Sequence, residues 1–555
     1  MHFNEIKTRN ELADFLEIPR KNFTYLLFVA KVDSFYYSFD IPKKSGFVRH
    51  IFAPTGLLKN VQVKLSQALW DHQLYLQTTG RKKSNISHAF EKEKSIITNA
   101  HIHRNKKIII CFDLKDFFES FHFGRVLGFF QNNRDFNLPR EVAVTIAQLT
   151  CYNGHLPQGA PSSPIITNLI CQILDVHLLK LARKYKLDYT RYADDLTFST
   201  NVKSFIAEQD TFIKDVKNEI ESSGFFLNES KTRIIYKDSM QIVTGLVVNK
   251  KINVPRNYYK NTRAMAQNLF KKEEFFIDGE RGTLRQLEGR LSFIDQIEHY
   301  NNIHDRSNRK HNQHNLSAKE NLYRNFLFYK YFIINEKMVV FTEGKTDILY
   351  IKAALKSLYK QYPKLISKDS HGDFKYNISF FTRTKRWKYF FGLTPDGADA
   401  IKSIYNYFIT GNNCPNLVEY FANIGTSFSP NPIIMLLDNE AKTERPLKKF
   451  ISNAKLTSEQ KEYLANNYYL LLERKSNLNL ITVPLPPGKK ECELEDLFSK
   501  DTLEIEIGGR KFSRKDEDQS QYYNKDIFSK YVFKNYSKID FSGFKPLLDI
   551  FNKLV

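Results

Sequence analysis

Two adjacent carboxylates, Asp194 and Asp195, lie inside the run RYADDLTFST, whose other residues are typical of a half-buried strand. Like charges side by side in such a segment repel each other and resist burial. A divalent cation would remove that cost. Because neighbouring side chains of a strand face opposite ways, a tight hairpin turn at Asp194-Asp195 is needed to present the first acid to a metal.

A third carboxylate, Asp113, ends the apolar run IIICFDL at residues 108–114. Three acids on adjacent strand ends could hold two Mg²⁺ ions, one activating a 3′-hydroxyl and one neutralising a triphosphate. An isolated Asp-Asp pair is more often an ordinary surface turn. The flanking apolar runs favour a metal site here, and therefore metal-assisted phosphoryl transfer.

Strands and a helix must position these acids. Residues 108–114 and 189–200 are typical of strands, and residues 161–185 between them have the apolar spacing of a long helix. Residues from about 258 to 300 are predicted to form two amphipathic helices. The apolar residues that recur there at steps of three and four are Leu284, Leu287, Leu291, Ile294 and Ile297.

A change of pattern after these helices predicts a second domain. Residues 301–314 are polar, basic and aperiodic, as in a linker or exposed loop. Beyond Lys337 a strand, a turn and a helix follow one another again, which is typical of a separate α/β domain. A chain of 555 residues is also too long for one ordinary hydrophobic core.

The motifs of the first part resemble those of reverse transcriptases, in the order of that family's palm and thumb. They are FDLKDFF (112–118), LPQGAPSSP (156–164), RYADD (191–195), NESKTR (228–233) and VTGLVVN (243–249). NAHIH (99–103) and the triplet Val243-Thr244-Gly245 resemble elements of the retron branch. The resemblance runs from about residue 15 to 330. It implies an α+β right-hand polymerase, with fingers and palm at residues 1–237 and a helical thumb at 238–330.

This resemblance implies roles for single residues. Asp113, Asp194 and Asp195 would bind two Mg²⁺ ions. Phe118 would be a steric gate against a ribose 2′-hydroxyl, although a core Phe is the alternative. Lys231 would protonate the leaving pyrophosphate. The residues implied in binding the incoming dNTP, besides Phe118, are Gln158 and Arg49. Lys231 and Arg49 could equally be solvated surface charges.

The retron branch further implies a dedicated template. Such enzymes copy a partner non-coding RNA from a guanosine 2′-hydroxyl into branched, RNA-linked single-stranded DNA. The residues implied in contacts with that RNA are Asn99, Ala100, His103, Val243, Thr244 and Gly245.

A second group of acids lies in residues 331–555. Glu343 follows the strand-like run MVVFT, Asp347 stands at the predicted helix start, and Asp438 and Glu440 end the run PIIMLLDNE. Acids at the carboxyl ends of neighbouring strands of an α/β sheet line the crevice where ligands usually bind. Asp438 and Glu440 would share a face if extended, as a Mg²⁺ site needs.

Two other interpretations of these motifs fail. GKT at 344–346 lacks the leading glycine of a P-loop, because Val339 stands there, and DNEAKT has Thr443 where a calcium loop needs glycine. The pattern resembles a Toprim domain with a mainly parallel sheet, of the overcoming-lysogenization-defect nuclease type. That resemblance implies one or two Mg²⁺ ions, with Glu343 as general acid/base and metal ligand. The other implied ligands are Asp438, Glu440, Glu495 and Asp496, and Asp347 joins the catalytic set.

Composition agrees with a nucleic-acid partner. Lys and Arg number 83 against 61 Asp and Glu, a net charge of +22, and such a field attracts polyanions. The 5 Cys form no CxxC pair, which favours a reducing compartment. No run approaches the roughly 20 apolar residues of a membrane span, and no signal peptide is recognisable. We therefore expect a cytoplasmic protein without membrane partners.

Joined together, the two halves suggest a retron antiphage system. The polymerase would make RNA-linked DNA that holds a fused nuclease inactive, and phage damage would release it against tRNA, other RNA or DNA; a homo-oligomer would ease such silencing. The alternative is a C-terminal module that only binds nucleic acid or drives assembly, which the D-N-E departure from a D-x-D motif mildly favours. A group II intron maturase would need an RNA-binding or HNH module, and neither is recognisable.

Overall fold

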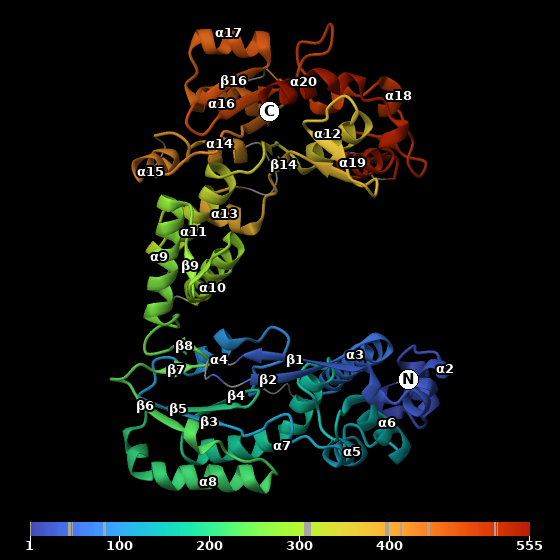
Figure 1. Cartoon of the computed structure of the whole chain (residues 1–555), viewed down its shortest axis with the longest axis vertical. Helices are drawn as coiled ribbons and strands as arrows, with labels where there is room; N and C mark the ends of the chain where they lie inside the picture. The colour runs from blue at the N-terminus through green and yellow to red at the C-terminus, as the bar shows by residue number, and fades with distance from the viewer. Residues whose placement is uncertain are drawn as a thin grey trace. The chain divides into compact units, whose positions relative to one another are not determined.

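The computed structural model describes residues 2–42, 46, 48–81, 85–304, 312–393, 399–410, 413–440, 445–514, 518 and 520–555. The chain forms two compact units, Met1–Pro255 and Arg256–Val555. Each has its own hydrophobic core. The first unit runs from blue to green and the second from green to red (Figure 1).

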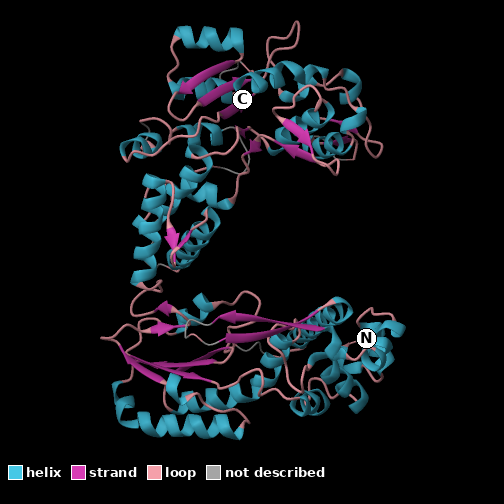
Figure 2. Cartoon of the chain, in the orientation of Figure 1, coloured by secondary structure: helices cyan, strands magenta, loops and turns pink. Residues whose placement is uncertain are grey.

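The centre of the first unit is a four-stranded antiparallel sheet in the order β4-β5-β3-β6 (Figure 2). Its strands are β3 (Ile108–Asp113), β4 (Asp188–Tyr192), β5 (Asp195–Thr200) and β6 (Arg233–Tyr236). Helices α7 (Ser163–Lys184) and α8 (Gln209–Ser222) cover one face of this sheet (Figure 1). Strand β3 is central and buried along nearly its whole length, so its sequence is a continuous apolar run rather than an alternation.

Helix α7 has the length and apolarity of a membrane span, with a mean hydropathy of 1.5 over its best window. It is a core helix here, because 61% of that window is buried inside the molecule. Buried polar side chains such as Asn168 and Asp175 also lie on it. The expectation that no apolar run approaches a span's length therefore needs correction, and burial explains the apolarity.

Around the sheet lie a long hairpin and several helices. The hairpin consists of β1 (Tyr36–Pro42) and β2 (Val48–Pro54). The helices are α1 (Arg9–Phe15), α2 (Arg20–Thr24), α3 (Gly56–Thr78), α4 (Ile96–Ile102), α5 (Phe123–Asn132) and α6 (Arg140–Thr150). A short hairpin of β7 (Ile242–Val243) and β8 (Leu246–Val247) packs against α4.

The second unit is built on a five-stranded sheet in the order β14-β11-β15-β17-β16. Its strands are β11 (Val339–Phe341), β14 (Ser379–Phe380), β15 (Ile433–Leu437), β16 (Tyr469–Glu473) and β17 (Leu478–Thr482). Only β16 is antiparallel to its neighbour, so the sheet is mainly parallel, as predicted. Parallel strands need crossover connections, and the helices of these connections cover both faces of the sheet. Strand β15 (Ile433–Leu437) is therefore apolar on both faces.

Helices and short hairpins surround this sheet. Those before it are α9 (Arg256–Lys272), α10 (Leu284–Ile303) and α11 (Ala318–Phe328), with the hairpin β9 (Phe276–Ile277) and β10 (Glu280–Arg281). Those that follow β11 are α12 (Lys345–Ser357), α13 (Lys385–Phe391), α14 (Asp399–Tyr405), α15 (Leu417–Asn423), α16 (Pro446–Ala454) and α17 (Ser458–Asn467). The last helices are α18 (Lys500–Leu503), α19 (Lys525–Lys534) and α20 (Lys545–Leu554). Two short strand pairs complete the unit: β12 (Ile366–Lys368) pairs with β13 (Phe374–Tyr376), and β18 (Lys511–Phe512) pairs with β19 (Tyr522–Tyr523).

The division between units differs from the expected boundaries after residues 237 and 330. The chain divides once, at Pro255, because the helices expected to form a thumb share a core with the later α/β region. Leu269 and Phe270 of α9 pack in the same cluster as Phe421 of α15, and the Thr426 hydroxyl donates to the Phe270 carbonyl at 2.7 Å. Of the expected linker at 301–314, residues up to Ile303 continue α10, and 305–311 lie outside the described residues.

Candidate active sites

The three predicted acids of the first unit meet at one end of the sheet. Asp113 ends β3 and stands directly opposite Asp195, the first residue of β5. Tyr192 pairs with Asp195, so the connecting turn is Ala193-Asp194, one residue earlier than predicted. Ala193 has a φ of 55°, a conformation that L-residues rarely adopt and that often marks a functional turn. The Leu114 N–H donates to the Asp194 carbonyl at 3.0 Å and ties the turn to β3.

A buried ion pair supports this turn. Arg191 is fully buried, and its guanidinium binds both carboxylate oxygens of Asp175 at 2.8 Å. The same guanidinium donates to the carbonyl of Ala193 at 3.4 Å. Sequence reasoning did not single out either residue, although a charged residue inside a buried strand requires a partner.

Electrostatics at this end of the sheet suit a cation. Burial, and then the charge of Asp113, raise the pKa of Asp194, while Lys231 and Arg49 lower it. Partial desolvation and the charges of Asp194 and Asp113 raise the pKa of Asp195 to about 6. Lys231 donates to both oxygens of Asp113, at 2.9 and 3.0 Å, and so partly offsets the repulsion.

The donor set fits Mg²⁺, because clustered carboxylates that repel each other are the ligands this ion prefers. In the described part of the chain, no three acidic, histidine or cysteine side chains have already converged on one metal-ligand position. Metal binding therefore requires small side-chain movements. One such movement is a shift of Lys231 away from Asp113, since Lys231 occupies both of its oxygens.

Of the residues expected to bind nucleotide, Arg49 lies near these acids. Arg49 is exposed on β2, and its charge acts on Asp194. The carbonyl of Gln158 accepts from the Phe52 N–H at 2.8 Å, which joins the LPQG loop to β2. Gly159 allows this approach, because a Cβ there would lie 2.7 Å from the Ile51 side chain. Phe118 is half-buried, whereas its neighbour Phe117 lies in the core.

Three residues expected to contact RNA are instead buried. Asn99, Ala100 and His103 have no exposed surface. The Thr190 hydroxyl donates to Asn99 Oδ1 at 2.6 Å, and His103 bridges Thr190 at 2.7 Å and Ser199 at 2.8 Å. Burial lowers the pKa of His103 to about 3, so the ring is neutral. The geometry therefore does not support direct RNA contact by these side chains; they hold β4 and β5 in place.

The triplet Val243-Thr244-Gly245 is only partly buried. Val243 is buried, while Thr244 and Gly245 form the turn between β7 and β8, with φ values of 45° and 82°. The Thr244 hydroxyl donates to the Ile96 carbonyl of α4 at 3.3 Å. Gly245 is exposed, so a partner molecule can reach this turn, as it can reach Ile102 of the first motif, which is 40% exposed.

In the second unit, the predicted acids meet at the carboxyl ends of β11 and β15. These strands are parallel neighbours, and Glu343 and Asp438 follow them. Glu343 Oε1 accepts from the Asp438 N–H at 2.9 Å, and Asp438 Oδ1 accepts from the Leu494 N–H at 3.0 Å. Asp347 Oδ2 accepts from the Gly344 N–H at 2.8 Å at the start of α12.

Mutual repulsion marks this second cluster. Burial, together with the charges of Asp347 and Glu440, raises the pKa of Glu343 to about 7. Burial and the charge of Glu495 raise the pKa of Asp347 to about 6. Burial, Glu343 and Asp347 raise the pKa of Asp438 well above its usual range. These carboxylates form a donor set that fits Mg²⁺.

The remaining predicted ligands behave differently from one another. Glu440 is buried and lies 3.3 Å from Arg445 Nε. Glu495 is buried near the acids, and its charge acts on Asp347 and Asp438. Although burial raises the pKa of Asp496, hydrogen bonds from Arg514 at 2.8 Å and Lys489 at 2.7 Å lower it to about 2. Asp496 is therefore already neutralised, and its role as a metal ligand has no support in the geometry.

Two cations at this site were not predicted. Lys525, at the start of α19, donates to Glu493 and Glu495 at 3.1 Å each. The Arg383 guanidinium donates to the carbonyls of Thr342 and Glu343 and so fixes the end of β11. Both lie far along the chain from their partners, so no local spacing could have identified them.

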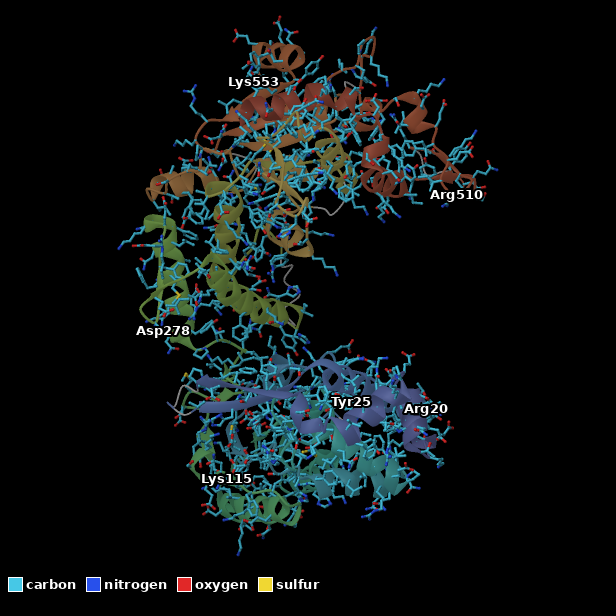
Figure 3. The ribbon with its side chains drawn as sticks, turned by 45° about the vertical axis from the view of Figure 1, so that its right-hand side comes forward. Arg20, Tyr25, Lys115, Asp278, Arg510 and Lys553 are labelled. Atoms are coloured by element: carbon cyan, nitrogen blue, oxygen red, sulfur yellow. The ribbon has the colours of Figure 1, made fainter. Side chains whose placement is uncertain are left out.

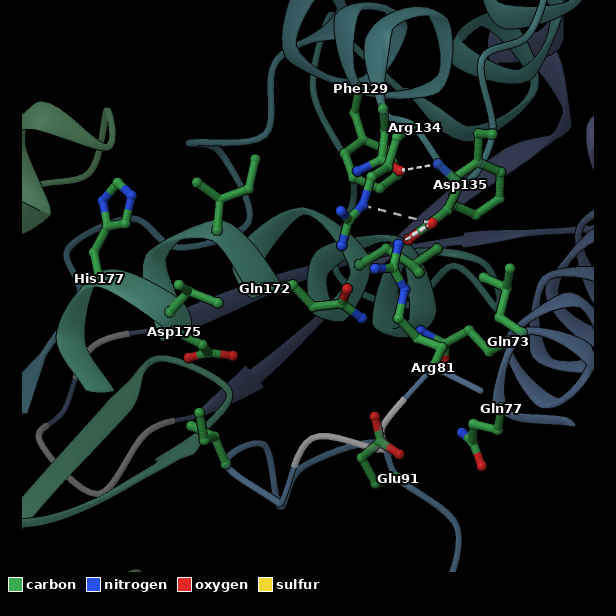
Figure 4. A pocket seen from close by; sticks show the side chains of 17 residues that line it. Gln73, Gln77, Arg81, Glu91, Phe129, Arg134, Asp135, Gln172, Asp175 and His177 are labelled. Atoms are coloured by element: carbon green, nitrogen blue, oxygen red, sulfur yellow. Dashed lines mark hydrogen bonds and ion pairs between the residues drawn. The ribbon is translucent and has the colours of Figure 1, made fainter. Parts of the chain in front are cut away.

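A cavity of about 440 Å³ lies elsewhere in the first unit, between α3, α5 and α7 (Figure 4). Polar residues such as Gln73, Gln172 and Arg134 line it, and Arg81 and Asp135 form an ion pair at one side. Asp175, the partner of Arg191, also belongs to its lining, but Asp113, Asp194 and Asp195 do not. The cavity is therefore distinct from the acidic end of the sheet.

Known proteins resemble the first part of the chain. Residues 41–275 match the family described as "Reverse transcriptase (RNA-dependent DNA polymerase)". The retron Ec86 reverse transcriptase of Escherichia coli is 32% identical over 293 residues, which cover 52% of this chain and 85% of the relative. The retron Mx162 reverse transcriptase of Myxococcus xanthus is 33% identical, covering 52% of this chain and 64% of the relative. A telomerase structure from Candida tropicalis covers 41% of this chain and 56% of its own, at 16% identity and a TM-score of 0.30, too low to support an argument about fold.

Proposed function

The chain belongs to the retron reverse transcriptases and is an RNA-directed DNA polymerase, and from this we propose that it copies a partner non-coding RNA into branched, RNA-linked single-stranded DNA. The observation that carries the proposal is the register that sets Asp113 opposite Asp195, with Asp194 in the turn between β4 and β5. In this family, bound Mg²⁺ supplies charge neutralisation at the triphosphate and activation of the attacking hydroxyl. The chain's part is to hold three carboxylates at one strand end.

The neighbouring residues would orient the reactants. Arg49 is placed to meet the triphosphate, and Gln158 and Phe118 would border the incoming dNTP. Lys231, which lies on Asp113, would turn to the departing pyrophosphate and donate its proton there.

Full-length protein purified with its RNA tests this half. We expect Asp195→Asn to lower DNA synthesis by more than the roughly 100-fold that loss of a supporting group costs at a metal site. The exposed helix residue Asp210, changed to Asn, is the matched control and should retain synthesis. Equal activity of the two variants would contradict the assignment of the acids.

For the second unit we propose a Toprim-like, Mg²⁺-dependent nuclease. The supporting observation is that Glu343 and Asp438 follow adjacent parallel strands and meet through a 2.9 Å hydrogen bond, with Asp347, Glu440 and Glu495 close by. Such a cluster suits phosphodiester hydrolysis, in which Glu343 would move a proton and the other acids would hold the cation.

One observation favours a second candidate, a non-catalytic binding module. Lys525 already neutralises Glu495, which leaves fewer free carboxylates for metal. Incubation of the full chain with tRNA, other RNA and DNA in Mg²⁺ separates the two. Cleavage that Asp438→Asn abolishes, and that the exposed-site control Asp399→Asn retains, supports the nuclease. If no substrate is cut while nucleic acid still binds, the binding module stands.

The biological role we propose is antiphage defence in the cytoplasm by abortive infection. The RNA-linked DNA would keep the second unit inactive until phage damage to that product releases it, and self-association would assist this. Expression of Glu343→Ala in phage-challenged cells tests the idea. Protection equal to wild type would remove the effector role while leaving the polymerase intact.

A further inference from the structure

Helix α12 carries a straight row of lysines. Lys345, Lys352 and Lys356 are spaced by seven and four residues, which places them on one stripe of an α-helix. The opposite side of the helix is buried in the core, through Tyr350 and Ile351 among others. The stripe begins at the end of α12 that lies next to the acids.

Aromatic rings border this row. They come from the end of α12, the hairpin β12–β13, β14 and the segment around α19: Tyr359, Phe374, Tyr376, Phe380, Phe533 and Tyr536, all partly buried. The lysine ammonium groups lie over their faces. Lys356 Nζ is 4.1 Å from the centroid of Phe533, Lys368 Nζ is 4.7 Å from that of Phe374, and Lys352 Nζ is 5.3 Å from that of Phe380.

We call Lys352, Lys356 and Lys368, together with these six rings, the lysine–aromatic surface. Its positive charge is not balanced by nearby acidic residues. Residues 352–375 contain 6 lysines against Asp369 and Asp373. Within the described ranges, Lys352, Lys356 and Lys368 have no carboxylate at ion-pair distance, whereas Lys345 lies 3.7 Å from Asp526. Lysine stems do cover apolar rings on ordinary protein surfaces. That explanation accounts for the stems, but not for three neighbouring cations, Lys352, Lys356 and Lys368, that have no carboxylate partner among the described residues.

We propose that the lysine–aromatic surface of the second unit binds single-stranded nucleic acid. Lysines would contact successive phosphates, and base faces would stack on rings that the ammonium groups now cover, as both groups do in proteins that bind single strands. A duplex offers phosphates but hides its base faces, so it would use the lysines alone. The rings therefore favour a single strand.

This inference deepens the proposed function by naming the class of strand that the second unit takes. It rests on the proposed function in one respect: the second unit must bind nucleic acid, whether or not it cleaves it. The lysine row also leads towards the acids: Lys345 and Lys356 are eleven residues apart, about 16 Å along the helix axis. A strand bound on the surface would thus run towards Glu343 and Asp347.

Photocrosslinking of the full chain tests the proposal. The probes are an RNA and a DNA oligonucleotide of one sequence, each with a photoreactive base, in single-stranded and duplex form. Crosslinked peptides from residues 352–376 and 525–538 are expected with both single strands and not with duplexes. Changing Lys352, Lys356 and Lys368 to Gln keeps the stems over the rings and should reduce these crosslinks about tenfold, and Lys→Glu should reduce them further. The slope of log affinity against log salt should fall by about 2.

A matched control separates local contact from net charge. Lys448, Lys449 and Lys461, exposed on α16 and α17, changed in the same way remove equal charge from another face and should leave the crosslinks unchanged. Equal loss in both variants, crosslinks only elsewhere, or preference for duplex or for an acidic protein would overturn the proposal. The variant Asp438→Asn distinguishes this proposal from the proposed nuclease. If the variant forms the crosslinks but does not cleave, the binding surface is supported. If the wild-type chain cleaves nucleic acid but forms no crosslinks at these peptides, the binding surface is contradicted.

Discussion

At the scale of single residues, a buried ion pair supports the turn between β4 and β5. Arg191 is fully buried and binds Asp175 through two hydrogen bonds while it also contacts Ala193. Removing one partner of such a pair leaves the other charge buried and unpaired, which typically costs about 3–5 kcal/mol. We expect Arg191→Met to lower the unfolding free energy of the first unit by about that amount and to reduce DNA synthesis.

The control for this prediction is a pair on the surface. Lys106→Ala removes the exposed contact with Asp188 and should cost at most about 1 kcal/mol. The double variant Arg191→Met with Asp175→Leu should recover part of the stability, because no charge is then left buried. If thermal unfolding shows the double variant to be less stable than Arg191→Met alone, the buried pair is not the source of the effect.

His103 gives the first unit a predictable response to pH. Burial lowers its folded pKa to about 3, below the roughly 6.5 of an unfolded chain. The unfolded state therefore binds the extra proton at mildly acidic pH. The stability from this group is fully present above about pH 6.5 and is lost as pH falls towards 3, at up to about 1.4 kcal/mol per pH unit.

Denaturant unfolding of wild type and His103→Gln across this range checks the sign. The variant should be less stable at neutral pH, because Thr190 and Ser199 lose a buried partner, and its stability should depend less on pH. The exposed His177, changed to Gln, should keep the wild-type slope. Affinity for the partner RNA should stay near wild type in His103→Gln, since the ring has no exposed surface. A selective loss of RNA binding would instead support the expected direct contact between His103 and the RNA.

At the scale of elements, strand β2 and the LPQG loop approach each other at Gly159. This residue has a φ of 112°, and an added Cβ would lie 2.7 Å from Ile51 Cγ2 and 2.8 Å from the Phe52 carbonyl oxygen. Gly159→Ala should therefore displace the loop and Gln158 with it, at a cost of about 1–3 kcal/mol and a raised KM for dNTP. Gly154→Ala is the matched control, with a φ of 83° and open space around its Cβ.

The elements themselves could largely be predicted, and the reason is local. Strands and helices can be predicted from the pattern of apolar residues over a short stretch of sequence. Examples are the apolar run that ends in Asp113 and the periodic apolar spacing in α7 and α10. The position of the turn at Ala193 could not be obtained in that way, because a shift by one residue leaves the apolar pattern almost unchanged. Long-range partners could not be predicted from local pattern either, since Lys525 and Glu495, which form a hydrogen bond, are 30 residues apart in the chain.

At the scale of the whole molecule, charge is distributed over both units. Basic side chains such as Lys115 of the first unit and Arg510 of the second lie at the surface (Figure 3). With a net charge of +22, nucleic-acid affinity of the full chain should fall steeply with salt. Binding measurements at several ionic strengths check this, and a flat response would remove polyanion attraction as the main source of affinity.

The single division at Pro255 predicts which fragments fold. Helices α9 to α11 share a core with the α/β region, through Phe270, Phe326 and Phe421 among others, so a cut after residue 330 would expose apolar surface on both sides. We expect residues 256–555 to unfold cooperatively and to resist protease. Residues 331–555 alone should aggregate or be digested, because exposed apolar surface of this kind drives association. Circular dichroism melting and limited proteolysis of the two fragments check this. A cooperative, protease-resistant 331–555 would show that the α/β region folds without the preceding helices and would contradict this prediction.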